Sequence, residues 1–404
     1  MPASSVGNGL ETGLVLPLVS PSDAGRVNRA RLLRLLYAHG PLSRSELARL
    51  LGAQRAVVGT VAQPLIDGGM LEEREARPSG PSGGKGGRPL WFAEDSAPIG
   101  AVHLMPASVR AAVVGVDGTV LASAEAPLDP RAGTESVLET AERALRSVMG
   151  MANRPLRGVG IAVGGMVNTS TGEIVHVELA PELDGLAIAP EMRRRLGLPV
   201  LLDLHPRAQA LGDLWFGEGR GLSSFVSLYC GDAIGMGYVT DGVVQRGNLG
   251  AGGEIGHTVL NVGGDLCRCG KRGCWDTMAT ATWLRRRAGE LGLPGAERLS
   301  GSALTGLVAA GTEGADVLLQ EYAEHLALGV ALVYQLLAPG AVLLHGDPAE
   351  AGEPLRRAVE SALSPLVMRH PGVNPSVILA PLDDAATLRG AACLVLADMM
   401  RFSV

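Results

Sequence analysis

Residues 252–276 read GGEIGHTVLNVGGDLCRCGKRGCWD, and they carry the most specific chemical signal in the chain. They contain one imidazole and three thiols, at His257, Cys267, Cys269 and Cys274. This is a complete tetrahedral set of zinc ligands, and the intervening glycines allow a short loop to fold back on one ion. Because four protein ligands leave no position for water, the spacing predicts a structural zinc ion rather than a catalytic one. Free thiols in a flexible loop are the alternative.

Composition and cysteine count place the chain in a broad class. Its 404 residues exceed one small module, and a content of 47% apolar and 19% charged residues is typical of a globular chain with large cores. Three of the five cysteines fall within eight residues, which favours metal ligation in a reducing, cytoplasmic setting over a disulfide framework. The start of the chain lacks a basic leading segment, and no apolar run approaches the ~20 residues of a spanning helix. We therefore expect a cytoplasmic protein with no membrane role and a flexible N-terminal arm at residues 1–25.

Charge is divided unevenly along the chain. Residues 26–88 hold eleven basic and five acidic residues, so this segment carries a net +6. Since the whole chain carries −6, the remainder carries −12. A small basic unit joined to a large acidic one is typical of a DNA-binding head on a separate sensing or catalytic body. Chance clustering of basic residues on a solvated face is the alternative.

The basic segment has the pattern of a helix-turn-helix. Residues 27–38 combine leucines and arginines at the spacing of an amphipathic helix. A second helix is expected over 43–51, where SRSE forms a capping box, and Gly52 follows it with a tight turn. A third helix is expected over 54–66, in which Pro64 requires an early end, a kink or a tolerated position.

The third helix of this segment is the expected recognition helix, because the ~12 Å width of the major groove admits an α-helix. After it, residues 70–76 and 88–92 can pair as the two strands of a wing around the Gly-rich segment 78–86. We expect seven residues to contact bases or the DNA backbone: Arg44, Gln54, Arg55, Thr60, Gln63, Lys85 and Arg88. A three-helix bundle that contacts proteins instead of DNA is the alternative.

From residue 98 onward, the pattern is one of strands alternating with helices. Strands are expected at 99–105, 108–118, 119–128, 158–167, 200–204, 341–346 and 376–382, with a two-stranded hairpin over 225–247 that turns at Thr240-Asp241-Gly242. Helices are expected at 134–149, 190–196, 316–337, 353–366 and from 385 onward. This order divides into two similar β-β-β-α-β-α halves, which predicts an α/β body of two lobes with a cleft between them.

The metal-binding segment resembles that of the ROK family, a group of sugar kinases and transcriptional repressors with an actin-like (ribonuclease H-like) fold. The likeness covers nearly everything after residue 25. It includes DLWFGEGRG at 213–221 and RGNLGAGGEIGH at 246–257.

The basic head also resembles part of this family. Residues 39–73 and the GGRP at 86–89 are similar to the winged head of the family's regulators, which its plain kinases lack. The resemblance implies a winged helix-turn-helix at 26–92 followed by a two-lobed ROK domain at 93–404. It puts the zinc loop at 254–276.

The chain departs from the family's kinases where those bind nucleotide. The resemblance puts His103–Ala107 at the first phosphate loop, without its glycines and carboxylate, and Gly231–Gly235 at the second. There Asp232 would face a phosphate, and like charges ~4 Å apart repel by roughly 4 kcal/mol at an effective dielectric constant near 20. The family's catalytic Asn-Asp pair corresponds to Leu204 and His205. These departures imply that kinase activity is lost; a carbohydrate kinase with atypical phosphate loops is the alternative.

The family's sugar contacts are partly retained. The resemblance assigns ligand binding to Glu254, His257 and His205, and to Asp276 in place of the family's glutamate. Alternatively, Glu254 only caps the zinc loop. The resemblance implies a transcriptional regulator, expected to be a repressor of sugar-related genes, that binds an inverted repeat of double-stranded DNA as a homodimer or homotetramer. A sugar or sugar phosphate is the expected effector, and a scaffold that binds a protein partner without an effector is a further alternative.

Overall fold

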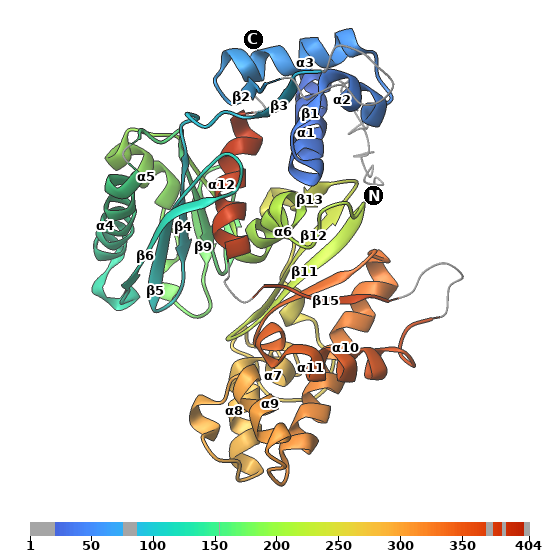
Figure 1. Cartoon of the computed structure of the whole chain (residues 1–404). Helices are drawn as coiled ribbons and strands as arrows, with labels where there is room; N and C mark the ends of the chain where they lie inside the picture. The colour runs from blue at the N-terminus through green and yellow to red at the C-terminus, as the bar shows by residue number, and fades with distance from the viewer. Residues whose placement is uncertain (1–20, 76–86, 153, 369–374, 382–384, 400–404) are drawn as a thin grey trace, which may run out of the picture.

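The structure is a computed structural model that describes residues 21–75, 87–152, 154–368, 375–381 and 385–399. A small head lies above two larger lobes (Figure 1). Of the expected arm over residues 1–25, residues 1–20 lie outside the described residues, as does the wing tip that contains Lys85, whereas residues 21–25 form the start of a helix. None of the described helices combines the length and the apolar character needed to span a bilayer.

The head consists of three helices and a small antiparallel sheet. Its elements are α1 (Pro21–His39), β1 (Leu42–Ser43), α2 (Arg44–Leu51), α3 (Arg55–Asp67), β2 (Leu71–Glu73) and β3 (Pro89–Phe92), with strand order β1-β3-β2. The expected capping box is present: the Ser43 amide donates to the Glu46 carboxylate at 2.7 Å, and the Glu46 amide donates to Ser43 Oγ at 3.3 Å. The two expected wing strands pair as β2 and β3. Helices and paired strands together form a winged helix-turn-helix.

Pro64 does not terminate the third helix. α3 continues past it to Asp67, so of the three expected outcomes an early end near Gln63 is wrong. The proline is exposed to solvent, and its carbonyl still accepts the amide of Gly68 at 3.1 Å. Because proline has no N–H, the carbonyl four residues before it loses its helical donor. Exposure to solvent lets water hydrogen-bond to that carbonyl instead.

The first lobe is built around a five-stranded sheet of order β10-β7-β4-β5-β6. The strands are β4 (Ile99–Leu104), β5 (Ser108–Val114), β6 (Val120–Pro127), β7 (Val159–Val163) and β10 (Val200–Leu204), with a separate hairpin of β8 (Met166–Asn168) and β9 (Glu173–His176). Two helices, α4 (Thr134–Ala152) and α5 (Ile188–Leu196), cover one face. The other face packs against α6 (His205–Phe216) and α12 (Ala385–Met399). Strands β4, β5, β7 and β10 are therefore buried on both faces, as their nearly continuous apolar sequences require, whereas the edge strand β6 leaves one face exposed.

The second lobe also contains a five-stranded sheet, of order β13-β12-β11-β14-β15. Its strands are β11 (Ser224–Cys230), β12 (Ile234–Thr240), β13 (Val243–Gln245), β14 (Val342–Gly346) and β15 (Val377–Leu379). Its helices are α7 (Asp276–Ala279), α8 (Ala281–Glu290), α9 (Gly301–Ala309), α10 (Ala315–Leu337) and α11 (Asp347–Leu363). Short 3₁₀ helices lie at Pro130–Ala132, Pro181–Leu183, Asn248–Gly250, Ile255–His257 and Ala296–Arg298. The C-terminal helix α12 crosses back to the first lobe.

Two expectations about the second lobe were wrong. Residues 225–247 form three strands rather than two, because the chain also reverses at Gly231–Ala233, where Cys230 pairs with Ile234. α11 begins at Asp347 rather than at Glu353, and Gly352 interrupts it with a φ of 69°.

The head packs directly on the body. The ring of Tyr37 in α1 stacks on Phe92 at 4.4 Å between centroids and lies 5.5 Å from Trp215 and 4.9 Å from Phe216 of α6. Its hydroxyl donates to the carbonyl of Val116 in the first lobe. Buried leucines of α1 share one hydrophobic core with α6 and α12. Such a joint core couples the position of the head to that of α6.

Candidate metal centre and ligand cavity

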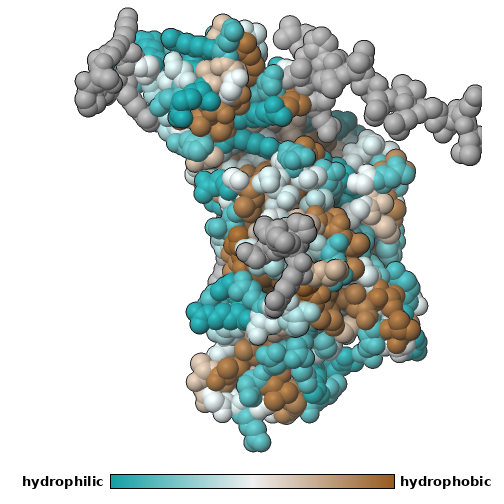
Figure 2. Space-filling view, turned by 90° about the vertical axis from the view of Figure 1, so that its right-hand side faces the viewer, coloured by the Kyte–Doolittle hydropathy of each residue, from teal (hydrophilic) through white to brown (hydrophobic). Residues whose placement is uncertain are grey.

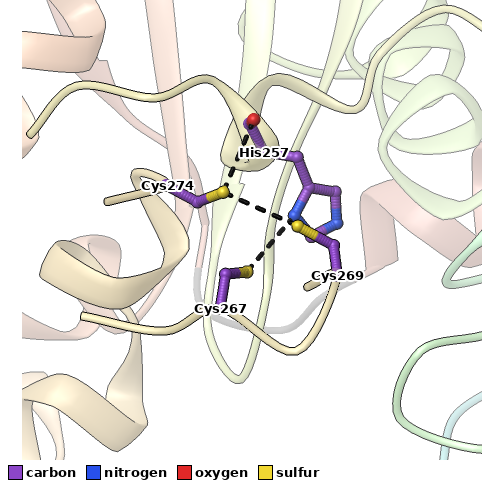
Figure 3. A group of neighbouring side chains, drawn as sticks. All are labelled: His257, Cys267, Cys269 and Cys274. Carbon is purple, nitrogen blue, oxygen red and sulfur yellow. Dashed lines mark hydrogen bonds between the residues drawn. The ribbon is translucent and has the colours of Figure 1, made fainter. Parts of the chain in front are cut away.

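Four side chains of the 254–276 loop converge on one point (Figure 3). The ligand atoms of His257, Cys267, Cys269 and Cys274 all lie within 4.8 Å of one another. Cys267 Sγ is 3.6 Å from His257 Nδ1, and Cys269 Sγ is 3.6 Å from Cys274 Sγ. A tetrahedral zinc ion with Zn–S bonds of about 2.3 Å separates its sulfurs by about 3.8 Å. The group can therefore hold a metal ion, and its donor set and spacing fit zinc.

Glycine allows the loop to fold back on itself. Isolated bridges join Val259 to Cys274 and Leu266 to Arg272, so the two ends of the loop lie side by side. Gly273 has a φ of 75°, and a side chain there would collide with the carbonyl of Asn261. A residue with a Cβ at this position would open the loop and separate the ligands.

Burial disfavours the ionised form of one of the thiols. Burial, followed by hydrogen bonds to Cys269 and Cys267, raises the pKa of Cys274 to about 12. Without a cation this thiol would keep its proton at neutral pH, whereas a bound dication would stabilise the thiolate. Metal binding would therefore release this proton.

A cavity of about 300 Å³ lies between the lobes beside this loop. The structure brings all four sequence-predicted ligand residues into its wall, namely His205, Glu254, His257 and Asp276. The rest of the wall is formed by His103–Ser108, Gly164, Gly165, Val177–Leu179, Leu204, Pro206, Tyr229 and Asp232–Gly235. His257 belongs to both sites, since its Nδ1 faces Cys267 while its Nε2 lies 3.5 Å from Glu178 Oε2.

Buried carboxylates line one side of the cavity. Asp276 accepts the amide of Ile234 at 2.9 Å through Oδ1, and its Oδ2 lies 4.0 Å from His257 Nδ1. Burial raises the pKa of Asp276 to about 6 and raises that of Glu254. Glu178, which the sequence did not single out, adds a third carboxylate from the segment that follows β9.

A buried arginine, also missed at the sequence level, anchors the loop before Glu254. Arg207 of α6 pairs with Asp203 at 2.7 Å, and both side chains are 1% exposed. The guanidinium donates to the carbonyls of Gly250 and Gly252 at 2.7 and 2.6 Å. Because these donors are buried and charged, they fix the loop that carries Glu254 relative to α6.

Comparison with known proteins identifies this architecture. The family model described as "ROK family" matches residues 100–398. The chain belongs to the ROK family. It is 24% identical to the xylose repressor of Caldicellulosiruptor bescii, covering 93% of this chain and 97% of that protein. It is 29% identical to the glucokinase of Thermotoga maritima, covering 70% of this chain and 92% of that protein.

A solved structure agrees with the ROK fold. The crystal structure of a ROK family transcriptional regulator, a homolog of the Escherichia coli MLC protein, superposes with a TM-score of 0.78 at 23% identity. The superposition covers 94% of this chain and 97% of the regulator's chain. The repressor and the regulator match over the head as well as the body, whereas the glucokinase spans a share close to that of the body alone.

In this ROK protein, three aromatic rings meet in the cavity wall where the resemblance places the first phosphate loop and the catalytic pair. The ring of His205 lies 4.4 Å from His103 and 4.5 Å from Tyr229, measured between centroids. All three residues line the cavity, and both histidines are buried. Asp232 adds a carboxylate at the second loop, 3.6 Å from Arg285. The wall thus contains rings at the first loop and a carboxylate beside Gly235 at the second.

The candidate DNA contacts fall into two groups on the head. Gln54, Arg55, Thr60 and Gln63 are exposed along α3. Arg44 and Arg88 both pair with Glu73 of β2, the latter at 3.6 Å, and so they tie the wing to α2. Hydrophilic residues cover much of the head in the space-filling view, whereas hydropathy is mixed over the lobes (Figure 2).

Proposed function

We propose that this protein is a DNA-binding transcriptional repressor of sugar-related genes whose ROK body senses a ligand and has no kinase activity. The proposal rests on the position of helix α6, whose two ends contact different sites. Its first residue, His205, lines the cavity, and its last residues, Trp215 and Phe216, contact Tyr37 of the head. One helix therefore joins the ligand site to the DNA-binding unit.

The geometry of α6 suits this role. Its 12 residues span about 18 Å, and all but the last are buried, so the helix moves as a rigid body. At one end Arg207 holds the loop that carries Glu254, and at the other Tyr37 is packed on the two aromatic rings. A ligand that shifts the loop therefore shifts the head.

This movement would control DNA binding in an oligomer. We infer a homodimer or homotetramer whose two recognition helices meet half-sites of an inverted repeat about 34 Å apart. In that assembly Gln54, Arg55, Thr60 and Gln63 contact base edges, and Arg44, Lys85 and Arg88 contact the backbone. A small rotation of each head changes the spacing of the helices and so the affinity for the operator. A structural zinc ion, held by His257 and the three cysteines, would keep the loop of the cavity wall in place.

The test is selection of genomic DNA fragments by the purified full-length protein, followed by footprinting. We expect enrichment of an inverted repeat. Arg55→Ala should weaken binding by about 1–3 kcal/mol and relax base preference at one position of each half-site. The control is Arg357→Ala, an arginine of α11 that is 74% exposed and lies in the second lobe; this variant should bind like the wild type. Absence of any enriched sequence would overturn the proposal.

The similarity to a glucokinase makes a carbohydrate kinase the second candidate. Its test is phosphorylation of hexoses and amino sugars in the presence of ATP and magnesium. We expect no turnover, because the phosphate loops lack the groups that neutralise developing charge. Turnover that His205→Ala abolishes would establish the kinase and overturn our proposal.

A further inference from the structure

The charges around the cavity are of one sign. Among the described residues that line it, four are carboxylates, Glu178, Asp232, Glu254 and Asp276, and none is lysine or arginine. Asp232 is 63% exposed and has Arg285 at 3.6 Å, which leaves three inner carboxylates. The nearest of the buried cations, Arg207, is engaged by Asp203 and two carbonyls.

The three inner carboxylates come from opposite sides of the cleft. Glu178 follows β9 of the first lobe, whereas Glu254 and Asp276 flank the metal loop of the second. His257 lies between two of them, 3.5 Å from Glu178 and 4.0 Å from Asp276.

Glu178 also has unused hydrogen-bonding capacity within the described structure. Its Oε1 is buried and has no hydrogen-bond partner, and its side chain is 16% exposed. An ionised carboxylate only accepts hydrogen bonds, and a buried acceptor without a donor costs free energy. The missing group is therefore a hydrogen-bond donor or a cation, and an ammonium group is both.

We propose that the cavity binds an unphosphorylated sugar with a free, protonated amine, and that Glu178 selects this amine. Hydroxyl groups of the sugar donate to Glu254 and Asp276, and the ammonium group donates to Glu178 across the cleft. A phosphate on the ligand would meet carboxylates, because the described wall of this cavity contains no arginine or lysine, so the proposal disfavours a sugar phosphate. The inference rests on the proposed function only in treating this ligand as the effector.

Calorimetric titration of the full-length, metal-containing protein tests the ligand class without DNA. The probes are glucosamine, galactosamine and mannosamine, their N-acetyl and neutral parent sugars, and their 6-phosphates. We expect at least one free amino sugar to bind about ten to a hundred times more tightly than its neutral, acetylated and phosphorylated counterparts. Equal or tighter binding of a counterpart overturns the proposal, as does the absence of amino-sugar binding up to about 10 mM.

Substitution then tests the role of Glu178. Glu178→Gln keeps the size of the side chain and should remove the preference for the amine while leaving the affinity for the neutral sugar within about threefold. Glu182→Gln, an exposed position of the same segment, is the matched control and should keep the preference. Metal content and melting temperature of both variants verify that the loop is intact. A Glu178→Gln protein that retains the preference contradicts the assignment.

The two proposals fail separately. A protein that binds amino sugars in calorimetry but whose operator affinity does not respond to them has the ligand site and lacks the proposed regulation. A protein that binds an operator but no amino sugar keeps the proposed function and loses the ligand assignment.

Discussion

The two nitrogens of His257 face different neighbours. Nδ1 lies toward Cys267 and Nε2 toward Glu178, so one residue belongs to both the metal centre and the cavity. A metal ion held through Nδ1 would fix the tautomer and leave the proton on Nε2, directed at the Glu178 carboxylate. Metal binding would therefore order the wall of the cavity as well as the loop.

We expect Cys267→Ser to abolish zinc binding, because a serine hydroxyl replaces a thiolate and the three remaining ligands do not close the shell. The melting temperature should fall by roughly 5–10 °C, since metal binding free energy contributes to folding. Atomic emission spectroscopy and calorimetry measure both quantities. Cys393→Ala, which changes a buried cysteine of α12 outside the cluster, should keep one zinc ion per chain. Retention of both the metal and the wild-type melting temperature by Cys267→Ser would argue against the site.

The sequence indicated metal ligands that lie close together in the chain. It did not indicate residues that reach the site from distant segments. The ligands His257 and Cys274 lie in one short loop, so their spacing alone indicates that they meet. Glu178 joins the same cavity from the other lobe, and no spacing in the sequence connects it to His257. Arg207 resembles any helical arginine in sequence, and only the fold reveals that it is buried beside Asp203.

At the scale of elements, α6 and α12 are packed unusually closely. Gly212 of α6 lies against the backbone of Ala386, and Gly390 of α12 lies against that of Ala208. Helices approach this closely only where glycine removes the side chain from the contact. The close contact makes α12, from the end of the chain, part of the support of α6.

We expect Gly212→Ala to destabilise the protein by about 2–4 kcal/mol, because the added methyl group would overlap the carbonyl of Ala386 and push the helices apart. Denaturant-induced unfolding measures the change. Gly306→Ala in α9 is the matched control, since a Cβ there meets no atom within 4 Å. That variant should be unchanged or more stable by up to about 1 kcal/mol, because alanine is the better helix former. Equal effects of the two substitutions would contradict the packing argument.

The start of α11 predicts a pH dependence of stability. Burial, followed by the charge of Glu350, raises the pKa of Asp347 to about 6, from about 3.9 in an unfolded chain. Between these values the folded state binds more protons than the unfolded state, so stability falls as pH rises from about 4 to about 6 and is level above that. We expect Asp347→Asn to remove up to about 3 kcal/mol of this decline.

Unfolding free energies of the wild type and of Asp347→Asn, measured between about pH 4 and pH 7, check this expectation. The difference in unfolding free energy between the two proteins should be smallest near pH 4, where Asp347 is neutral in the folded state. It should grow as the pH rises. Parallel curves over the whole range would show that Asp347 is not the group responsible.

The elements that sequence reasoning misjudged are those whose ends depend on tertiary contacts. The Asp241-Gly242 turn was found, whereas the reversal at Gly231–Ala233 was not, because β12 becomes a separate strand only by pairing with β11. Similarly, the first turn of α11 follows β14 directly and is interrupted at Gly352, so periodicity alone indicated only its second part. The capping box of α2 was identified because both of its hydrogen bonds are local.

At the scale of the whole molecule, under the proposed function, the contact between head and body would determine whether a ligand can influence DNA binding. Besides the aromatic cluster around Tyr37, Arg157 of the first lobe donates to the carbonyls of Gly68 and Gly69 at the end of α3, at 3.2 and 3.4 Å. The recognition helix is thus held at its C-terminal end by the body, and α1 is held by α6. In the proposed mechanism, motion between the lobes would be transmitted to the head only while these contacts persist.

The variant Tyr37→Ala tests the coupling between operator binding and effector binding separately from each binding event. The substitution removes the ring between Phe92, Trp215 and Phe216 and leaves the surfaces of α3 and the cavity unaltered. We expect operator affinity and effector affinity, each measured alone, to change by less than about tenfold. The ratio of operator affinities with and without the effector, typically about 5–150-fold in coupled proteins, should approach one.

Fluorescence anisotropy with a labelled operator measures this ratio. Tyr37→Phe is the matched variant, because it keeps the stacked ring and loses only the hydrogen bond to the carbonyl of Val116. It should retain most of the coupling if the ring transmits the motion. Should Tyr37→Ala respond to the effector as strongly as the wild type, the signal must travel by another route, through Arg157 and the end of α3. In that case Arg157→Ala, rather than Tyr37→Ala, would abolish the response, and α6 would serve only to hold the loop before Glu254.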